Sequence, residues 1–363
     1  MSLIVLSGCS TLQDFFGTAP GKYREPPAVP LAERPVEEPI SANHFVLESP
    51  QQSIVGVPQI VLTNESDTFA DLARAYGLGY DELIAANPDV DPWLPGENTP
   101  VLLPTQFVLP AVPREGIVLN IAAKRLFYFP AVAEGQPLIV KTFPIGIGRV
   151  GWETPLGTTT VIAKAKNPHW YVPLSVRQEH AALGDPLPSV IPPGPENPLG
   201  HRVLKLDMPG YLIHGTNQPY GVGMRISHGC VRLYPENIEY LYELVDIGES
   251  VNIINEPYLL GEYDGQWYFE AHAPLEDDVL GAAERLQQLV EGHSDINIEQ
   301  ARAVADIANG VAARVGADTG EVLARARLVR NTVELDPDAP TLSEVREMID
   351  EAVREVDTAT ESM

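Results

Sequence analysis

Residues 211 to 234 (YLIHGTNQPYGVGMRISHGCVRLY) hold the side chains best suited to chemistry in this sequence. Cys230 is one of only two cysteines in 363 residues, and His214 precedes it in the same stretch. A thiol becomes a useful nucleophile when a nearby base, usually an imidazole, removes its proton. The apolar run at 211 to 213 indicates a short buried strand that ends at His214. The stretch therefore predicts a cysteine enzyme in which His214 is the base.

The residues around Cys230 offer further groups that acyl transfer needs. Negative charge develops on the attacked carbonyl oxygen, and the backbone N–H groups near His228, Gly229 and Cys230 are candidate donors to it. Arg232 lies two positions after Cys230, so strand alternation would place both side chains on one side. Its guanidinium could bind a substrate carboxylate in a bidentate pair, or it could form a structural ion pair with an acidic neighbour.

A zinc site is the main chemical alternative for this stretch. His214, His228 and Cys230 could ligate zinc together with one more group. The sequence has no second CxxC or HxxxH cluster to complete such a site. We therefore expect no metal and no other cofactor.

The motif His-Gly-Thr-Asn at 214 to 217, followed by Ser-His-Gly-Cys-Val-Arg at 227 to 232, resembles the active-site signature of YkuD-type L,D-transpeptidases. This is the ErfK/YbiS/YcfS/YnhG group. The resemblance implies that Cys230 attacks the tetrapeptide stem of peptidoglycan, forms a thioester and expels the terminal D-amino acid. An amine would then accept the acyl group, either from a second stem peptide, giving a 3→3 cross-link, or from an envelope lipoprotein. It also implies acylation by carbapenem-type β-lactams.

The same resemblance implies roles for other residues of the motif. The backbone carbonyl of Gly215 would orient His214, and Ser227 and Gly229 would belong to the catalytic loop. His228 would bind substrate or donate a hydrogen bond, although it could equally serve only to shape the loop. Asn217 would contact the substrate.

Two other functions stay open at this point. Water could intercept the thioester, which would make the protein an L,D-carboxypeptidase or an amidase. Alternatively, the chain could be a wall-binding adaptor whose cysteine domain is idle. Analysis of muropeptide products distinguishes hydrolysis from transfer, since only transfer yields dimers.

Charge and the N-terminal residues bear on location. The formal net charge of −26 argues against nucleic acid as a partner and against electrostatic docking on an anionic membrane. Leu6-Ser7-Gly8-Cys9 resembles a lipobox, in which the cysteine is lipidated, although a chance match is the alternative. The eight residues before Cys9 contain no Lys or Arg, unlike a usual signal peptide. We expect a periplasmic or envelope protein held on a membrane by a lipid at Cys9.

The N-terminal third divides by composition. Residues 1 to 9 would be the remnant of the signal, and residues 10 to 57, rich in Pro, Glu and Ala, predict an extended tether that buries no core. Residues 58 to 104 predict a strand, two helices and a strand, and resemble a LysM module that binds glycan strands. A structural spacer is the alternative, because Ser66 stands where that family usually has glycine.

The pattern of the whole chain predicts a multidomain α+β protein. Residues 114 to 256 alternate in hydrophobicity and predict a mainly-β catalytic domain, like a sandwich or barrel, with one helix from Pro235. The insertion at 167 to 200 contains Trp170 and Tyr171, which favour a wall or lid of the substrate cleft over a structural flap. Residues 274 to 363 predict an acidic helical appendage. Its candidate helices are Glu276 to Val290, Ile298 to Val315, Thr319 to Glu334 and Thr341 to Val356.

Overall fold

The computed structural model describes residues 29 to 334, apart from 279, 292, 294, 295, 297, 308 and 316 to 318, and also residues 343, 344, 346 and 347. Cys9, the first part of the predicted tether and most of the helix predicted for 341 to 356 lie outside the described residues. Within the described residues, every helix is too short or too polar to cross a membrane.

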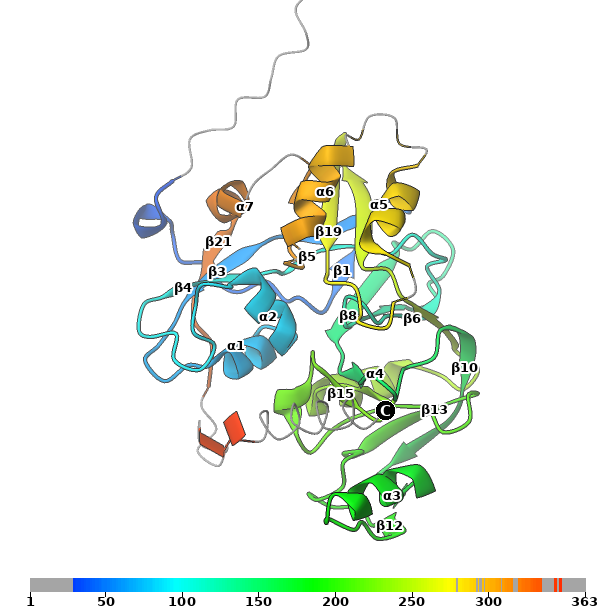
Figure 1. Ribbon diagram of the computed structural model, residues 1–363. Coiled ribbons are helices and arrows are strands. Elements are labelled where there is room, and N and C mark those ends of the chain that lie inside the picture. The colour runs from blue at the N-terminus through cyan, green and yellow to red at the C-terminus, as the bar shows by residue number, and fades with distance from the viewer. Residues whose placement is uncertain are drawn as a thin grey trace, which may run out of the picture.

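A nine-stranded sheet forms the centre of the molecule (Figure 1). Most strands pair antiparallel, and β6 pairs in parallel with β17, as β14 does with β16. The strands predicted between 114 and 256 are confirmed, and two short strands that were not predicted join them, one at residues 45–46 and one at 231–232. In order across the sheet the strands are β1 (Phe45–Val46), β8 (Ile139–Pro144), β7 (Arg125–Phe129), β6 (Gly116–Asn120), β17 (Ser250–Ile254), β10 (Gly157–Lys166), β13 (Arg202–Leu206), β14 (Leu212–His214) and β16 (Val231–Arg232).

One helix, α4 (Pro235–Leu244), covers the end of the sheet that carries the predicted site. Proline suits its first position because the ring fixes φ and the missing N–H needs no partner there. Ile238 and Leu241 are fully buried and share a hydrophobic cluster with Ile213 and Val231. This packing holds β14 and β16 side by side, and so fixes the backbone at His214 and Cys230.

The predicted order of strand, helix, helix and strand in 58 to 104 is confirmed. The elements are β3 (Gln59–Leu62), α1 (Phe69–Ala75), α2 (Tyr80–Ala86) and β4 (Pro100–Leu103). The segment is not a separate body, because Phe69 packs in one cluster with Phe127 of the central sheet and Met224 of the loop before the site.

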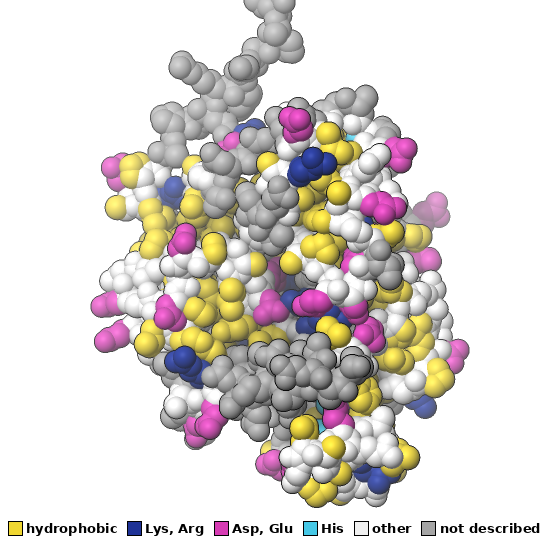
Figure 2. All heavy atoms as spheres, in the orientation of Figure 1, with side chains coloured by type: hydrophobic (Ala, Val, Ile, Leu, Met, Phe, Trp, Pro, Cys, Tyr) yellow, Lys and Arg dark blue, Asp and Glu magenta, His cyan; other side chains and the backbone are white. Residues whose placement is uncertain are grey.

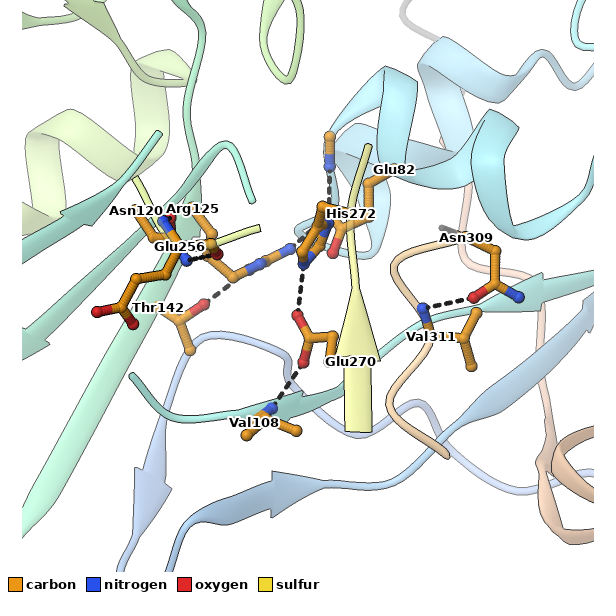
Figure 3. A network of polar contacts seen from close by, with 11 residues as sticks. Glu82, Val108, Asn120, Arg125, Thr142, Glu256, Glu270, His272, Asn309 and Val311 are labelled. Atoms are coloured by element: carbon orange, nitrogen blue, oxygen red, sulfur yellow. Dashed lines mark hydrogen bonds and ion pairs between the residues drawn. The ribbon is translucent and has the colours of Figure 1, made fainter. Parts of the chain in front are cut away.

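A buried ion pair adds to this junction. Arg125 on β7 donates to Glu82 on α2 at 2.6 Å and to Thr142 at 2.7 Å, as Figure 3 shows. Nearby, Gly79 and Gly223 approach so closely that an added Cβ on Gly223 would lie 2.3 Å from the Gly79 Cα. The N-terminus of α2 therefore rests on the loop that leads into the site.

The prediction that residues up to 57 form a tether without a core is wrong for the described part. β1 pairs with β8, and β2 (Ile54–Gly56) pairs with β5 (Gln106–Val108). Ala42, Leu47 and Val55 are each only 3% exposed. The prolines do not prevent this, because short apolar segments between them can add to the edge of an existing sheet.

The prediction of a purely helical C-terminal appendage is also wrong. α5 (Ala282–Val290) and α6 (Ile298–Ile307) pack beside a three-stranded sheet of β18 (Tyr258–Tyr263), β19 (Gln266–Ala271) and β20 (Ala313–Arg314) (Figure 1). After α7 (Thr319–Arg325), β21 (Arg327–Val329) pairs in parallel with β3. Leu328 and Val329 are buried while Arg327 is exposed, and so short a segment shows no helical period.

The insertion between β10 and β13 forms a small lobe at the lower end of the view in Figure 1. It contains β11 (Trp170–Tyr171), α3 (Leu174–Ala182) and β12 (Val190–Ile191), and β11 pairs with β12. On the face seen in Figure 2, acidic side chains are scattered rather than gathered in one patch. Such a distribution is typical of solvated charge.

Candidate active site

Cys230 opens into a cleft of about 610 Å³. One wall comes from β10 and β13, and another from the insertion, which contributes Trp170 and Tyr171. His228 and Trp152 also line the cleft. The structure thus brings the insertion, as predicted, to the same cleft as the candidate nucleophile.

The strands β14 and β16 place the two candidate catalytic side chains. They pair in parallel, with Ile213 opposite Val231 and His214 opposite Arg232. Cys230 immediately precedes β16, while His214 ends β14 and is only 3% exposed. The pairing brings the two residues onto adjacent strands, with Cys230 just before the start of β16 and His214 at the end of β14.

Backbone carbonyls hold the His214 ring. Its Nδ1 lies 2.5 Å from the carbonyl oxygen of Gly215, and the backbone of Leu199 also makes a hydrogen bond to the ring. With the proton on Nδ1, donated to Gly215, Nε2 keeps its lone pair. Burial, aided by the positive charge of Arg232, lowers the pKa of His214 to about 3. The imidazole is therefore neutral near pH 7, and the predicted orienting role of Gly215 has the expected geometry.

Cys230 is held as a thiol rather than a thiolate. Its Sγ lies 3.6 Å from the carbonyl oxygen of Gly210, to which the S–H donates. Burial raises the pKa of the thiol, and the N–H of Leu212 and the charge of Arg232 offset this only in part. The resting pair is thus neutral, and the thiol proton must move to the imidazole as the sulfur attacks.

Hydrogen bonds hold the loop around the thiol. The Ser227 hydroxyl donates to the carbonyl oxygen of Cys230 at 2.6 Å, and the Thr154 hydroxyl donates to that of Gly229 at 3.0 Å. Gly229 has φ +96°, and a Cβ there would lie 3.0 Å from the Tyr211 ring. Glycine is required on both counts. Thr154 was not foreseen, because nothing in its local sequence marks it.

Two further residues that sequence reasoning missed contact His228. Its Nε2 lies 2.7 Å from a carboxylate oxygen of Glu179, and the other oxygen of that carboxylate accepts from Arg149. Arg149 follows β9 (Ile147–Gly148), which pairs with β15 (Arg225–Ser227). These positions are far apart in sequence and belong to no motif.

The predicted substrate-binding residues differ in their placement. Trp170 and Tyr171 line the cleft, and Tyr171 is 74% exposed. Asn217 is exposed and is not among the residues that line the cleft. Arg232 is half-buried and does not line the cleft either, yet its charge acts on both Cys230 and His214.

Metal-ligating side chains do not gather at this site. Among the described residues, no group of three or more His, Cys, Asp or Glu side chains is arranged to hold a metal ion. Cys230 lines the cleft, while His214 is buried on the adjacent strand and does not line it. A cleft thiol with an imidazole on the neighbouring strand is the residue pair that acyl transfer by a thiol uses.

Comparisons with known protein sequences also indicate acyl transfer. A family model of the L,D-transpeptidase catalytic domain, YkuD, matches residues 114–253. The probable L,D-transpeptidase YcfS of Escherichia coli K12 is 39% identical over 247 residues, covering 66% of this chain and 76% of that protein. The probable L,D-transpeptidase YbiS of the same strain is 40% identical over 239 residues, covering 65% and 76%. The catalytic domain of the E. faecium L,D-transpeptidase is 19% identical with a TM-score of 0.30, covering 40% of this chain and 100% of that one.

Proposed function

The chain belongs to the YkuD family of L,D-transpeptidases, and from that premise we propose that Cys230 is the nucleophile of its peptidoglycan acyl transfer and His214 the base. The observation that carries this assignment is the hydrogen bond from His214 Nδ1 to Gly215, which leaves Nε2 as a proton acceptor. Cys230 supplies the thiol in the cleft, just before the start of the strand that pairs with the strand of His214.

In the first half of the reaction, the Cys230 sulfur attacks the carbonyl carbon before the terminal D-amino acid of a tetrapeptide stem. The thiol proton passes to Nε2 of His214, and the carbonyl oxygen becomes an oxyanion near the backbone N–H groups of His228, Gly229 and Cys230. When the C–N bond breaks, His214 returns the proton to the leaving amine. A thioester on Cys230 and a free D-amino acid result.

In the second half, an amine attacks the thioester carbon. His214 takes a proton from this amine and returns it to the departing sulfur, so the thiol and the neutral imidazole are restored. The acceptor is the side-chain amine of another stem peptide, which gives a 3→3 cross-link, or an amine of an envelope lipoprotein. Trp170 and Tyr171 would contact the stem peptide from the insertion.

Product analysis on purified muropeptides tests this proposal. Tetrapeptide monomers incubated with the protein should yield dimers with a 3→3 link and free D-amino acid. Tripeptide monomers without dimers would instead identify hydrolysis of the thioester. Full complementation of a deletion strain by Cys230→Ala would mean that the wall-binding role, and not the chemistry, matters.

The segment at 58 to 104 is proposed to bind glycan strands as a LysM module does. Its support is the order β3, α1, α2 and β4, together with its fixed position against the loop before the site. A pull-down of Cys230→Ala on purified peptidoglycan should retain binding, since the module does not depend on the thiol. Loss of binding in this variant would contradict a glycan-binding module.

An envelope location with a lipid on Cys9 completes the proposal. Substrate chemistry supports the location, because stem peptides and cross-links are found in the cell wall. Radiolabelled fatty acid should enter the wild-type protein and not a Cys9→Ala variant. Equal labelling of the two would rule out this anchor.

A further inference from the structure

Three side chains from separate segments meet behind the catalytic loop. Arg149 follows β9, Glu179 lies on α3 of the insertion, and His228 stands two positions before Cys230. Glu179 bridges the other two with its two carboxylate oxygens. The side chains of Arg149, Glu179 and His228 are 3%, 22% and 20% exposed, so water reaches the cluster only at its edge.

The charges of this cluster define how the His228 ring is oriented. Nε2 of His228 lies 2.7 Å from a carboxylate oxygen of Glu179, which only accepts hydrogen bonds, and 3.2 Å from Nη2 of Arg149, which only donates them, so both side chains fix the position of this nitrogen. Burial, joined by the charge of Arg149, lowers the pKa of His228 to about 4, although Glu179 opposes this. Burial acts to raise the pKa of Glu179, but the hydrogen bonds from Arg149 and His228 outweigh it and lower that pKa. A neutral imidazole and a carboxylate therefore meet near pH 7.

The ring is held from a second direction by Trp152. The two rings meet edge to face, with centroids 4.9 Å apart and planes 77° apart. Arg149 is also tied to the loop, because its backbone N–H donates to the carbonyl oxygen of Ser227 at 3.0 Å. The backbone from Ser227 to Cys230 thus has only limited freedom while Glu179 keeps its contacts.

We infer that Glu179 is a positioning residue, which acts through His228 to hold the backbone at Gly229 and Cys230 in the geometry that acyl transfer requires. Because Glu179 belongs to the same insertion as Trp170 and Tyr171, it also links the cleft wall to the reacting loop. The inference rests on the proposed role of Cys230 as nucleophile.

The test is a double-mutant cycle on the transfer reaction, with Glu179→Ala, His228→Ala and the double variant. Glu179→Ala should lower kcat about 10- to 100-fold, the size expected when reacting groups are misplaced by a fraction of an ångström or more. KM should change little, because the loop geometry matters in the transition state. The double variant should be no slower than His228→Ala alone, since Glu179 acts through that ring.

Two further variants separate positioning from a general loss of structure. Glu179→Gln keeps one oxygen for His228 or Arg149 and loses the other, so it should restore part of the kcat lost in Glu179→Ala. Glu196→Gln is the matched control, because Glu196 lies on the same insertion, is exposed and does not line the cleft. It should leave kcat unchanged. Glu179→Leu, which preserves volume, replaces the Ala variant if that variant does not fold.

Several results would overturn the inference. They are wild-type kcat in Glu179→Ala or Glu179→Leu, a Gln variant as slow as these, or effects that multiply in the double variant. All of them presuppose a wild-type protein that transfers acyl groups. If the wild type formed neither dimers nor tripeptide product, the proposed function itself would fail, and the two outcomes are therefore distinct.

Discussion

Arg232 lies directly opposite His214 in the parallel pair of β14 and β16, and its positive charge lowers the pKa of both His214 and Cys230. For His214 this adds to burial and keeps the imidazole neutral. For Cys230 it works against burial and favours the thiolate. The charge of Arg232 therefore acts on the protonation of both the base and the nucleophile.

Removing that charge should make the thiol less reactive. In Arg232→Ala the pKa of Cys230 should rise further, so alkylation by iodoacetamide at about pH 8 should slow several-fold. Arg232→Lys keeps a positive charge and should lose less. A substrate-binding role would show separately as a higher KM in both variants, because Lys cannot form the bidentate pair. Unchanged alkylation in Arg232→Ala would contradict the electrostatic role.

The pH dependence of alkylation tests the neutral resting pair. Because burial raises the pKa of Cys230, the thiolate fraction should grow about tenfold per pH unit up to at least about pH 9. His214, with a pKa of about 3, should add no inflection near neutrality. A plateau of the alkylation rate between about pH 5 and pH 8 would instead reveal a thiolate–imidazolium pair.

The exposed aromatic side chain of the insertion should act on binding alone. Tyr171 is 74% exposed and lines the cleft, so Tyr171→Ala should raise KM for a muropeptide about threefold to tenfold, with an unchanged melting temperature. Leu183→Ala is the matched control, since Leu183 is exposed on the same insertion and does not line the cleft. Equal KM values for the two variants would exclude Tyr171 from substrate contact.

The junction between α2 and the central sheet should depend on its buried ion pair. The side chains of Arg125 and Glu82 are 2% and 8% exposed, so Glu82→Ala leaves a buried charge without its carboxylate (Figure 3). The free energy of unfolding should fall by about 3–5 kcal/mol in urea titrations. Arg74→Ala breaks the exposed pair with Glu236 and should cost about 1 kcal/mol or less. Similar losses in both variants would contradict this assignment.

Much of the fold could be predicted because its signals are local. Alternation around Ile117 and Leu119 predicts β6, and Pro235 with the apolar spacing after it predicts α4. The segment at 327 to 329 could not be placed in this way. Its pairing with β3 joins residues more than 260 positions apart, and no local pattern records such a contact.

The residues of the site also differ in whether the local sequence reveals them. Cys230, His214 and Gly215 stand in one motif, so their chemistry could be foreseen. Glu179 and Arg149 act from other segments, and their roles follow only from the three-dimensional contacts with His228. Asn217 belongs to the same motif, and the motif predicts that it contacts the substrate. In the structure it is exposed and does not line the cleft.

Intact-protein mass spectrometry after incubation with a carbapenem tests the nucleophile most directly. The wild type and Cys9→Ala should each gain the mass of one opened carbapenem, and Cys230→Ala should gain nothing. His214→Ala should react much more slowly, since the thiol would lack its base. An adduct that persists in Cys230→Ala, or a wild type that stays unmodified, would contradict the assignment of Cys230.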